Sequence, residues 1–235
     1  MNIADWLDGG DPHDADRSSA QTAWLRAWAE IAPRRVLDLG CGTGRALVPL
    51  AKAGHDVVGF DRNGAALAAC RADLGDAPAQ LCEVDFTSPW PDCGAPFDAV
   101  ICLGNSFMLV PDLDTATVML RQCARVLADG GILVIDDIPS EFLPEVAAGN
   151  WADGVSDDGA LQMIWEADDD VFTIRSGSEV DESNWSITSD DVRLRLWTDE
   201  RLTEAASAAG LSGPFRPETG PGVGTVLIMR SVQVP

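Results

Sequence analysis

The sequence has little positive charge. Its 16 Lys plus Arg residues stand against 38 Asp plus Glu residues, which gives a formal net charge of -22. Such an acidic surface repels the phosphates of nucleic acids and of anionic lipids at every distance beyond local contacts. The composition therefore argues against a nucleic-acid partner and a membrane partner. Lys52 is the only lysine, and whether this reflects a saline habitat or a GC-rich genome stays open.

Long apolar runs and paired cysteines are also missing. No apolar run approaches the roughly 20 residues that span a bilayer. The acidic segment 1–10 has no apolar stretch with flanking positive charge, so it does not resemble a secretory signal. The six cysteines include no Cys-x-x-Cys pair, and several lie in apolar runs where a reduced thiol packs. We therefore expect a soluble, cytoplasmic protein with reduced cysteines.

Apolar runs typical of strands covered on both faces alternate with helical periodicity up to residue 137. The expected strands are 35–39, 56–60, 80–84, 99–103 and 132–135. The expected helices are 20–31, 46–53, 63–74 and one that begins at a cap formed by Asp114. Five strand–helix units in series predict an α/β fold with a doubly wound parallel sheet, which binds ligands at the carboxyl ends of its strands.

The pattern changes after Asp137. Short alternating segments joined by acidic turns, typical of antiparallel hairpins, occupy 161–165, 171–175, 185–188 and 192–196. A final helix at 198–209 and a last strand at 225–229 return the chain to the main sheet. We expect a main domain of residues 1–137 and 198–235, and an inserted antiparallel β subdomain of residues 138–197 that covers the substrate cleft.

A glycine-rich turn, Val-Leu-Asp-Leu-Gly-Cys-Gly-Thr-Gly-Arg, follows the first strand at residues 36–45. Its three glycines leave the backbone open to a nucleoside, because side chains would block the approach. A dinucleotide-binding turn has the pattern Gly-x-Gly-x-x-Gly, and Arg45 occupies the position of its third glycine. Asp38 adds a carboxylate that suits a cationic amino group and offers nothing to a pyrophosphate. The turn therefore disfavours an NAD-linked oxidoreductase.

Acidic residues follow the next two strands. Asp61 lies 23 residues after Asp38, close to the spacing of about 20 residues at which an acidic side chain reaches ribose hydroxyls in such folds. Asp85 is placed to accept a hydrogen bond from an adenine amino group, while the backbone of Phe86 addresses the ring nitrogen. An ordinary solvated strand end is the alternative for Asp85, and a tight strand–helix connection without a ligand is the alternative for the glycine turn.

Together these segments resemble class I S-adenosylmethionine-dependent methyltransferases; they are residues 36–45, 57–61, 83–86, 97–107 and 127–135. The resemblance implies a Rossmann-like sheet of seven strands with the last antiparallel, and S-adenosyl-L-methionine as cofactor. It also implies that Asp38 receives the ammonium of the cofactor and that Leu103 and Gly104 approach its methionine portion through backbone atoms. The expected cofactor-binding residues are Asp38, Gly40, Cys41, Gly42, Gly44, Asp61, Arg62, Asp85, Phe86, Leu103 and Gly104.

The segment Phe97–Phe107 is especially similar to glycine N-methyltransferases, in which the asparagine lies beside the methyl acceptor. This similarity implies an acceptor-side role for Asn105, with a turn cap as the alternative. Asp136 and Asp137 end the fifth strand; they could act as general base, bind a cationic acceptor, ligate a metal or simply be solvated. The chain has no tyrosine, and Asp137-Ile-Pro-Ser stands where the glycine enzymes carry a basic residue, so glycine is not the expected acceptor.

The sequence therefore predicts an enzyme, a monomer or a homodimer, that transfers a methyl group to a nitrogen or oxygen of a small molecule. Its expected catalytic residues are Asn105, Asp136 and Asp137, and no metal is expected. An amine acceptor needs only to bind deprotonated, whereas a hydroxyl acceptor requires a base such as Asp136 or Asp137. The alternative is a non-catalytic protein that binds S-adenosylmethionine or S-adenosylhomocysteine and acts in regulation or interaction.

Overall fold

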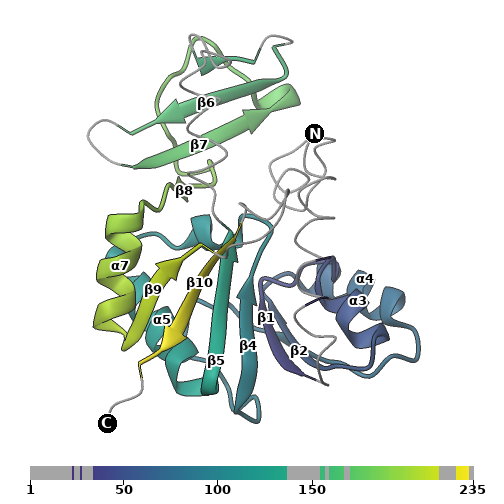
Figure 1. Cartoon of the computed structure of the whole chain (residues 1–235). Helices are drawn as coiled ribbons and strands as arrows, with labels where there is room; N and C mark the ends of the chain where they lie inside the picture. The colour runs from purple at the N-terminus through teal and green to yellow at the C-terminus, as the bar shows by residue number, and fades with distance from the viewer. Residues whose placement is uncertain are drawn as a thin grey trace.

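The computed structural model describes residues 23, 27, 34–136, 154–156, 159–166, 170–216 and 226–232. A seven-stranded sheet in the order β3-β2-β1-β4-β5-β10-β9 forms the centre of the molecule (Figure 1). Its strands are β1 Arg35–Leu39, β2 Asp56–Asp61, β3 Gln80–Glu83, β4 Phe97–Cys102, β5 Leu127–Asp136, β9 Leu211–Phe215 and β10 Val226–Ser231. Strands β1 to β5 pair in parallel, and β10 runs antiparallel to both β5 and β9. The expected doubly wound sheet with an antiparallel last strand is confirmed.

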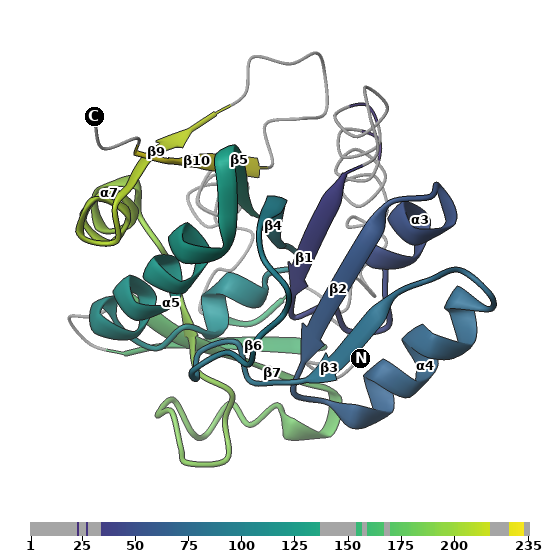
Figure 2. The same ribbon diagram turned by 90° about the horizontal axis from the view of Figure 1, so that it is seen from below.

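Helices cover both faces of this sheet, which explains why its inner strands read as continuous apolar runs. Helices α3 (Leu47–Lys52) and α4 (Gly64–Leu74) lie on one face, and α5 (Leu113–Val126) and α7 (Asp199–Ala208) lie on the other (Figure 2). Alternate residues of β1 join the two cores: Val36 packs with the α3 and α4 side, and Leu37 packs with the α5 and α7 side. The sheet is thus held between two apolar cores, and its strand order brings the carboxyl ends of β1 to β5 to one edge.

Capping side chains set where the helices begin. The Asn63 side chain accepts hydrogen bonds from the N–H groups of the first turn of α4, and Thr198 caps α7 in the same way. The cap of α5 is Asp112, whose Oδ1 accepts from the Thr115 N–H at 2.7 Å. The expectation of Asp114 as this cap is wrong, because Asp114 lies within the first turn of the helix.

Two expectations about strands were wrong. One strand of the main sheet, β9, was missed, and one strand expected after the main sheet, at 185–188, does not form. Strand β9 was missed because its sequence, Leu-Ser-Gly-Pro-Phe, lacks apolar alternation; proline is tolerated there since β9 is an edge strand. The expected strand 185–188 is a loop, because Arg175 and Asp191 take up its backbone polar groups at Ser186 and Thr188. The expected helix 20–31 lies largely outside the described residues.

A second, three-stranded antiparallel sheet follows β5 along the chain, in the order β6-β7-β8. Its strands are β6 Leu161–Trp165, β7 Val171–Ser176 and β8 Leu194–Arg195. We call it the small sheet; its strands fall in three of the four segments that were expected to form antiparallel hairpins. Its apolar core includes Met108 from the short 3-10 helix η1 (Ser106–Leu109), which follows β4. The Arg195 side chain also donates to the Pro111 carbonyl at 2.7 Å, so the small sheet packs at the carboxyl end of β4 (Figure 1).

All six cysteines fall within the described residues, and all are free thiols. Among the helices that the structure describes, none combines the length and the apolar character needed to cross a bilayer.

Candidate cofactor-binding site

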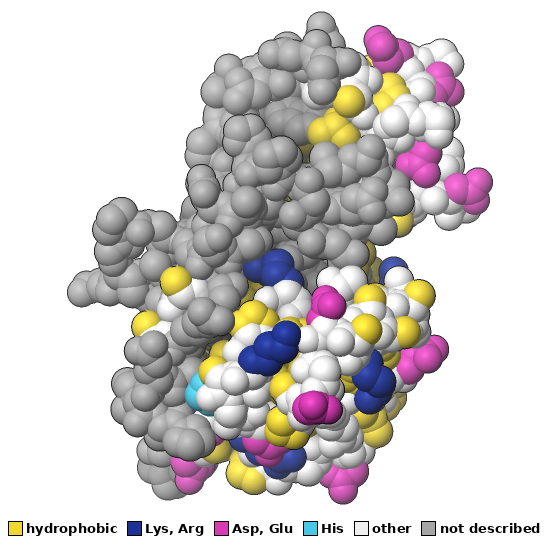
Figure 3. All heavy atoms as spheres, turned by 90° about the vertical axis from the view of Figure 1, so that its right-hand side faces the viewer, with side chains coloured by type: hydrophobic (Ala, Val, Ile, Leu, Met, Phe, Trp, Pro, Cys, Tyr) yellow, Lys and Arg dark blue, Asp and Glu magenta, His cyan; other side chains and the backbone are white. Residues whose placement is uncertain are grey.

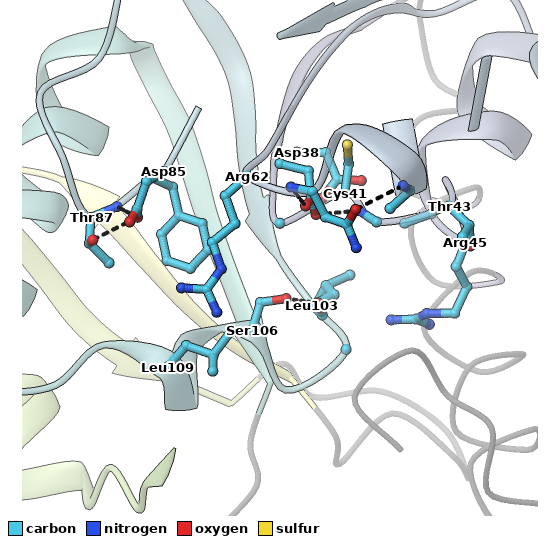
Figure 4. Close-up of a pocket in the computed structure, with 18 residues that line it drawn as sticks. Asp38, Cys41, Thr43, Arg45, Arg62, Asp85, Thr87, Leu103, Ser106 and Leu109 are labelled. Atoms are coloured by element: carbon cyan, nitrogen blue, oxygen red, sulfur yellow. Dashed lines mark hydrogen bonds between the residues drawn. The ribbon is translucent and has the colours of Figure 1, made fainter. Parts of the chain in front are cut away.

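A cavity of about 210 Å³ opens at the carboxyl ends of β1, β2, β3 and β4 (Figure 4). Four connecting segments line it, as expected for a ligand site of a doubly wound sheet. The turn after β1 contributes Gly40, Cys41, Gly42, Thr43, Arg45 and Ala46, in addition to Asp38 of the strand itself; the others contribute Asp61, Arg62, Asn63, Ala66, Asp85, Phe86, Thr87, Leu103, Gly104, Ser106 and Leu109. The structure therefore brings ten of the eleven predicted cofactor-binding residues around one cavity.

The glycine turn needs glycine for two different reasons. Gly40 has φ +71°, and a Cβ atom on it would lie 2.7 Å from the Ser106 Oγ across the cavity wall. Gly44 has φ +96°, and a Cβ atom there would lie 2.6 Å from the Cys70 Sγ of α4. Gly40 thus keeps the space between the turn and Ser106 free of a further side chain. Gly44 is the one predicted cofactor-binding residue that does not line the cavity, and it lets the turn pack on the helices instead.

Asp61 connects the end of β2 to the glycine turn. Its Oδ2 accepts from the Gly42 N–H and its Oδ1 accepts from the Asn63 N–H, both at 2.8 Å. These two bonds fix the orientation of the carboxylate at the cavity. Since each carboxylate oxygen can accept two hydrogen bonds, one acceptor position on each oxygen remains for a ligand. Two neighbouring hydroxyl groups match this arrangement.

Asp38 is a buried carboxylate, with 4 % of its surface exposed, and it lines the same cavity. Burial raises the pKa of Asp38 to about 7, an effect that the Arg45 charge reduces and the Asp61 charge reinforces. A carboxylate is costly to ionise where water is excluded, and a cation placed beside it removes that cost. Asp38 is therefore suited to a positively charged ligand group.

Asp85 lies in a rigid loop after β3. Its Oδ1 accepts from the Thr87 backbone N–H at 2.9 Å and from the Thr87 Oγ1 at 2.7 Å (Figure 4). Burial raises the pKa of Asp85, but the Thr87 hydrogen bonds and the Arg62 charge more than offset it, so the pKa lies below its usual value. The adjacent Phe86 carbonyl accepts from the Trp90 Nε1 at 2.7 Å, which anchors the loop. Asp85 can therefore present Oδ2 to a hydrogen-bond donor.

Two arginines and a thiol complete the wall. The Arg45 and Arg62 side chains reach the cavity from different loops, after β1 and after β2 respectively (Figure 4). Burial and then the charges of Asp38 and Asp61 raise the pKa of the Cys41 thiol far above its usual value, so this cysteine is a neutral lining group. A planar guanidinium such as that of Arg62 can stack on an aromatic base.

Several lining residues were not predicted. The sequence analysis used Arg45 only as evidence against a dinucleotide-binding motif, because it occupies the position of the third glycine. Thr43 and Ala46 could have been found, since they belong to the same turn. Ser106 and Leu109 lie on η1, and no sequence signal indicated that this short helix turns back over the cavity.

Two of the three predicted catalytic residues, Asn105 and Asp136, fall within the described part of the chain. Asn105 is 2 % exposed and Asp136 is 4 % exposed, and neither lines the cavity. The Asn105 backbone N–H donates to the Asp136 Oδ2 at 2.6 Å. Asp137 lies outside the described residues. The structure thus joins Asn105 to Asp136 by a backbone contact.

Comparison with known proteins gives matches over the part of the chain that lines the cavity. Residues 36–131 match the methyltransferase domain family. The cypemycin N-terminal methyltransferase of Streptomyces sp is 35% identical over 121 residues, 51% of this chain and 49% of that protein. Glycine N-methyltransferase of Oryctolagus cuniculus is 33% identical over 137 residues, 51% of this chain and 46% of that protein. The chain thus spans about half the length of these curated relatives.

Other matches extend along nearly the whole chain. A dTDP-4-amino-2,3,4,6-tetradeoxy-D-glucose N,N-dimethyltransferase of Saccharopolyspora spinosa is 24% identical over 242 residues, 95% of this chain and 93% of that protein. An S-adenosylmethionine-dependent methyltransferase from Clostridium acetobutylicum has a TM-score of 0.65 at 15% identity and covers 98% of this chain and 97% of its own. The S-adenosylmethionine-bound amino pentose methyltransferase CalS10 from Micromonospora echinaspora has a TM-score of 0.62 at 23% identity and covers 91% of this chain and 89% of its own. The solved structures share the fold.

Proposed function

We propose that the chain is a class I S-adenosylmethionine-dependent methyltransferase, as its sequence predicted, and that it transfers methyl groups to an amino nitrogen of a small molecule. The observation that carries the proposal is the meeting of three carboxylates from neighbouring strand ends, Asp38, Asp61 and Asp85, around one glycine-walled cavity. Asp61 and Asp85 can each accept further hydrogen bonds, and the buried Asp38 carboxylate is stabilised by a cation. Each of these requirements matches one part of the cofactor.

The residues present fit the cofactor. Asp61 would accept from the two ribose hydroxyls, and Asp85 from the adenine amino group with Arg62 beside the ring. Asp38 would receive the ammonium of the methionine portion, near the backbone of Leu103 and Gly104. Gly40 leaves the room for this contact, because a Cβ atom there would fill the gap to Ser106. The cofactor, when bound, supplies a methyl group that the positive sulfur has already activated.

Because the methyl group is activated, the protein's main task is to position the acceptor lone pair and to exclude water. An amine needs no base once it is bound deprotonated. Asp136, the predicted base within the described residues, is buried and engaged by the Asn105 N–H, and it does not line the cavity. This arrangement supports an amine more than a hydroxyl as acceptor.

The relatives support the same choice. The match that spans 95% of this chain is an amino-sugar N,N-dimethyltransferase, and CalS10 is described as an amino pentose methyltransferase. On the face shown in Figure 3, acidic side chains lie at the outer edge of the lobe that contains the small sheet, and the whole chain has a net charge of -22. Such a surface attracts a protonated amine and repels phosphate groups. The net charge favours an amine without phosphates, such as a free amino sugar, which would differ from the dTDP-linked sugar in the name of that relative.

A matched acceptor panel tests the proposal. The protein with S-adenosylmethionine is incubated with amino sugars, with the corresponding hydroxyl sugars and with nucleotide-linked amino sugars, and S-adenosylhomocysteine release is measured. We expect release with the free amines, at a rate that rises with pH as the amine loses its proton, and none with the matched alcohols. Turnover with alcohols alone would refute amine transfer. Tight S-adenosylhomocysteine binding without turnover on any acceptor would favour the non-catalytic alternative.

A further inference from the structure

The contact between Asn105 and Asp136 lies at the place where β4 leaves the sheet. The last pair of the β4–β5 ladder is Cys102 with Ile135, so Asp136 extends one residue beyond it. Beyond this pair, the Asp136 side chain accepts a hydrogen bond from the Asn105 backbone N–H at 2.6 Å. Both residues are almost fully buried. A charged acceptor in a buried place makes a strong hydrogen bond.

The segment that this bond holds has an uncommon backbone conformation. Gly104 has φ +74° and Asn105 has φ +64°, two successive left-handed residues. Such a conformation is disfavoured for an L-residue and persists where surrounding contacts determine it. The Ser106 Oγ also donates to the Leu103 carbonyl at 3.0 Å, which closes the turn. These two hydrogen bonds help to hold residues 103–106, defined here as the β4 turn, in this shape.

The β4 turn forms one wall of the cofactor cavity. Leu103, Gly104 and Ser106 line it, whereas Asn105, between them, does not. The turn also abuts the opposite wall, since the Ser106 Oγ would lie only 2.7 Å from a Cβ atom on Gly40. The Asn105 carbonyl then accepts from the Met108 N–H at 3.0 Å and so begins η1. A shift of the Asn105 peptide would therefore move the wall where the methionine portion of the cofactor is proposed to bind.

We propose that Asp136 is a positioning residue: it holds the β4 turn in the shape that binds the cofactor, through the Asn105 backbone amide, and it takes no proton from the acceptor. The inference rests on the proposed use of this cavity for S-adenosylmethionine. A general base must reach the proton that it removes, directly or through one water, whereas Asp136 is buried and one of its oxygens already accepts the Asn105 N–H. The part of Asp136 that matters is thus an acceptor oxygen, which asparagine also has.

Two substitutions separate the roles. Asp136→Asn keeps an oxygen for the Asn105 N–H and removes the charge, whereas Asp136→Ala removes the acceptor. Asp129→Asn is the matched control, because Asp129 is an exposed residue near the opposite end of the same strand and loses the same charge. Binding of S-adenosylhomocysteine and of S-adenosylmethionine is measured by calorimetry, turnover is measured against pH, and circular dichroism checks the fold of each variant.

We expect Asp136→Ala to weaken the binding of both ligands by about tenfold or more, since a buried amide loses its charged acceptor. Asp136→Asn should stay within about fivefold of the parent protein, in line with a neutral bond replacing a charge-assisted one, and should keep the same pH profile of kcat. Asp129→Asn should match the parent protein throughout.

Two results would overturn the positioning role. If Asp136→Asn bound S-adenosylhomocysteine normally but lost turnover, Asp136 would act as a base or through its charge. If a folded Asp136→Ala bound both ligands like the parent, the β4 turn would not need Asp136. The asparagine variant decides the question even if the alanine variant does not fold. Because these ligands bind without an acceptor, a wrong acceptor class leaves the result intact, whereas a parent protein that binds neither ligand would refute the proposed function as well.

Discussion

Lowering the pH below 7 should weaken cofactor binding, and the cause is a single carboxylate. Asp38 is 4 % exposed, and burial raises its pKa from 3.8 to about 7, with Arg45 opposing and Asp61 adding to the rise. If Asp38 receives the cofactor ammonium, only the protein with an ionised Asp38 binds the cofactor well. Protonation therefore competes with binding in the range where the pKa of the empty site lies.

The size of the effect follows from that pKa. The ionised fraction of a group with a pKa of 7 falls about 25-fold between pH 7.5 and pH 5.5, and the apparent affinity falls with it. Binding should release about one proton at pH 5.5 and about a quarter of a proton at pH 7.5. The measurements stop at 7.5 because α-amino groups titrate at about 7.7–8.0.

The same rise in pKa affects stability with a definite sign. The pKa of Asp38 is higher in the folded protein than the unfolded value of 3.8, so its stabilising contribution is complete below that value and is lost as the pH rises through about 7. Keeping the side chain ionised in the empty fold then costs about 4 kcal/mol, at 1.36 kcal/mol for each pKa unit. A bound cation offsets this cost, so the rise in Tm on adding S-adenosylmethionine should be larger at pH 7.5 than at pH 5.5.

Calorimetry of S-adenosylhomocysteine binding in buffers of different ionisation enthalpy measures affinity and proton release together. Asp38→Asn is the control: it should bind weakly, with an affinity that does not change over this pH range. An affinity of the parent protein that stays constant from pH 5.5 to 7.5, with no proton released, would refute the assignment of Asp38 to the ammonium.

Four further substitutions have defined outcomes. Asp61→Ala should weaken S-adenosylhomocysteine binding by about 100-fold, because two hydroxyls and the Gly42 N–H lose one acceptor; unchanged calorimetric affinity in a folded variant would contradict the ribose role. Gly40→Ala should abolish most binding, because the new Cβ would lie 2.7 Å from the Ser106 Oγ. Gly54→Ala is its control, since Gly54 has φ +91° and nothing within 4 Å of a Cβ atom. This variant should lose only about 1–2 kcal/mol of stability in urea unfolding, from backbone strain. Asp191→Ala should destabilise the small sheet by about 3 kcal/mol, since it removes both carboxylate bonds of the buried Arg175, at 2.8 and 2.7 Å; a change below 1 kcal/mol in denaturant unfolding would show that the carbonyls of Asn184 and Ser186 hold Arg175 without it.

The wrong or missing elements share a physical reason. Strand β9 exists because β10 supplies hydrogen-bond partners to a sequence with little strand character of its own. The expected strand 185–188 failed for the converse reason: a sequence with alternating character lost its backbone groups to Arg175 and Asp191. In both places the contacts come from other parts of the chain, and local pattern cannot report them.

The sequence by itself determined the alternating α/β plan, the glycine turn and the acidic residues at the carboxyl ends of the first three strands. These features depend on local steric rules and on short spacings, since each carboxylate lies at a strand end that meets the same edge of a parallel sheet. Tertiary structure alone decided that Ser106 and Leu109 join the cavity wall and that the Asp136 carboxylate, 31 residues along the chain, binds the Asn105 amide. A buried side chain finds its partner through the packing of whole elements, so the same aspartate that reads as a base in the sequence is a hydrogen-bond acceptor for the backbone in the fold.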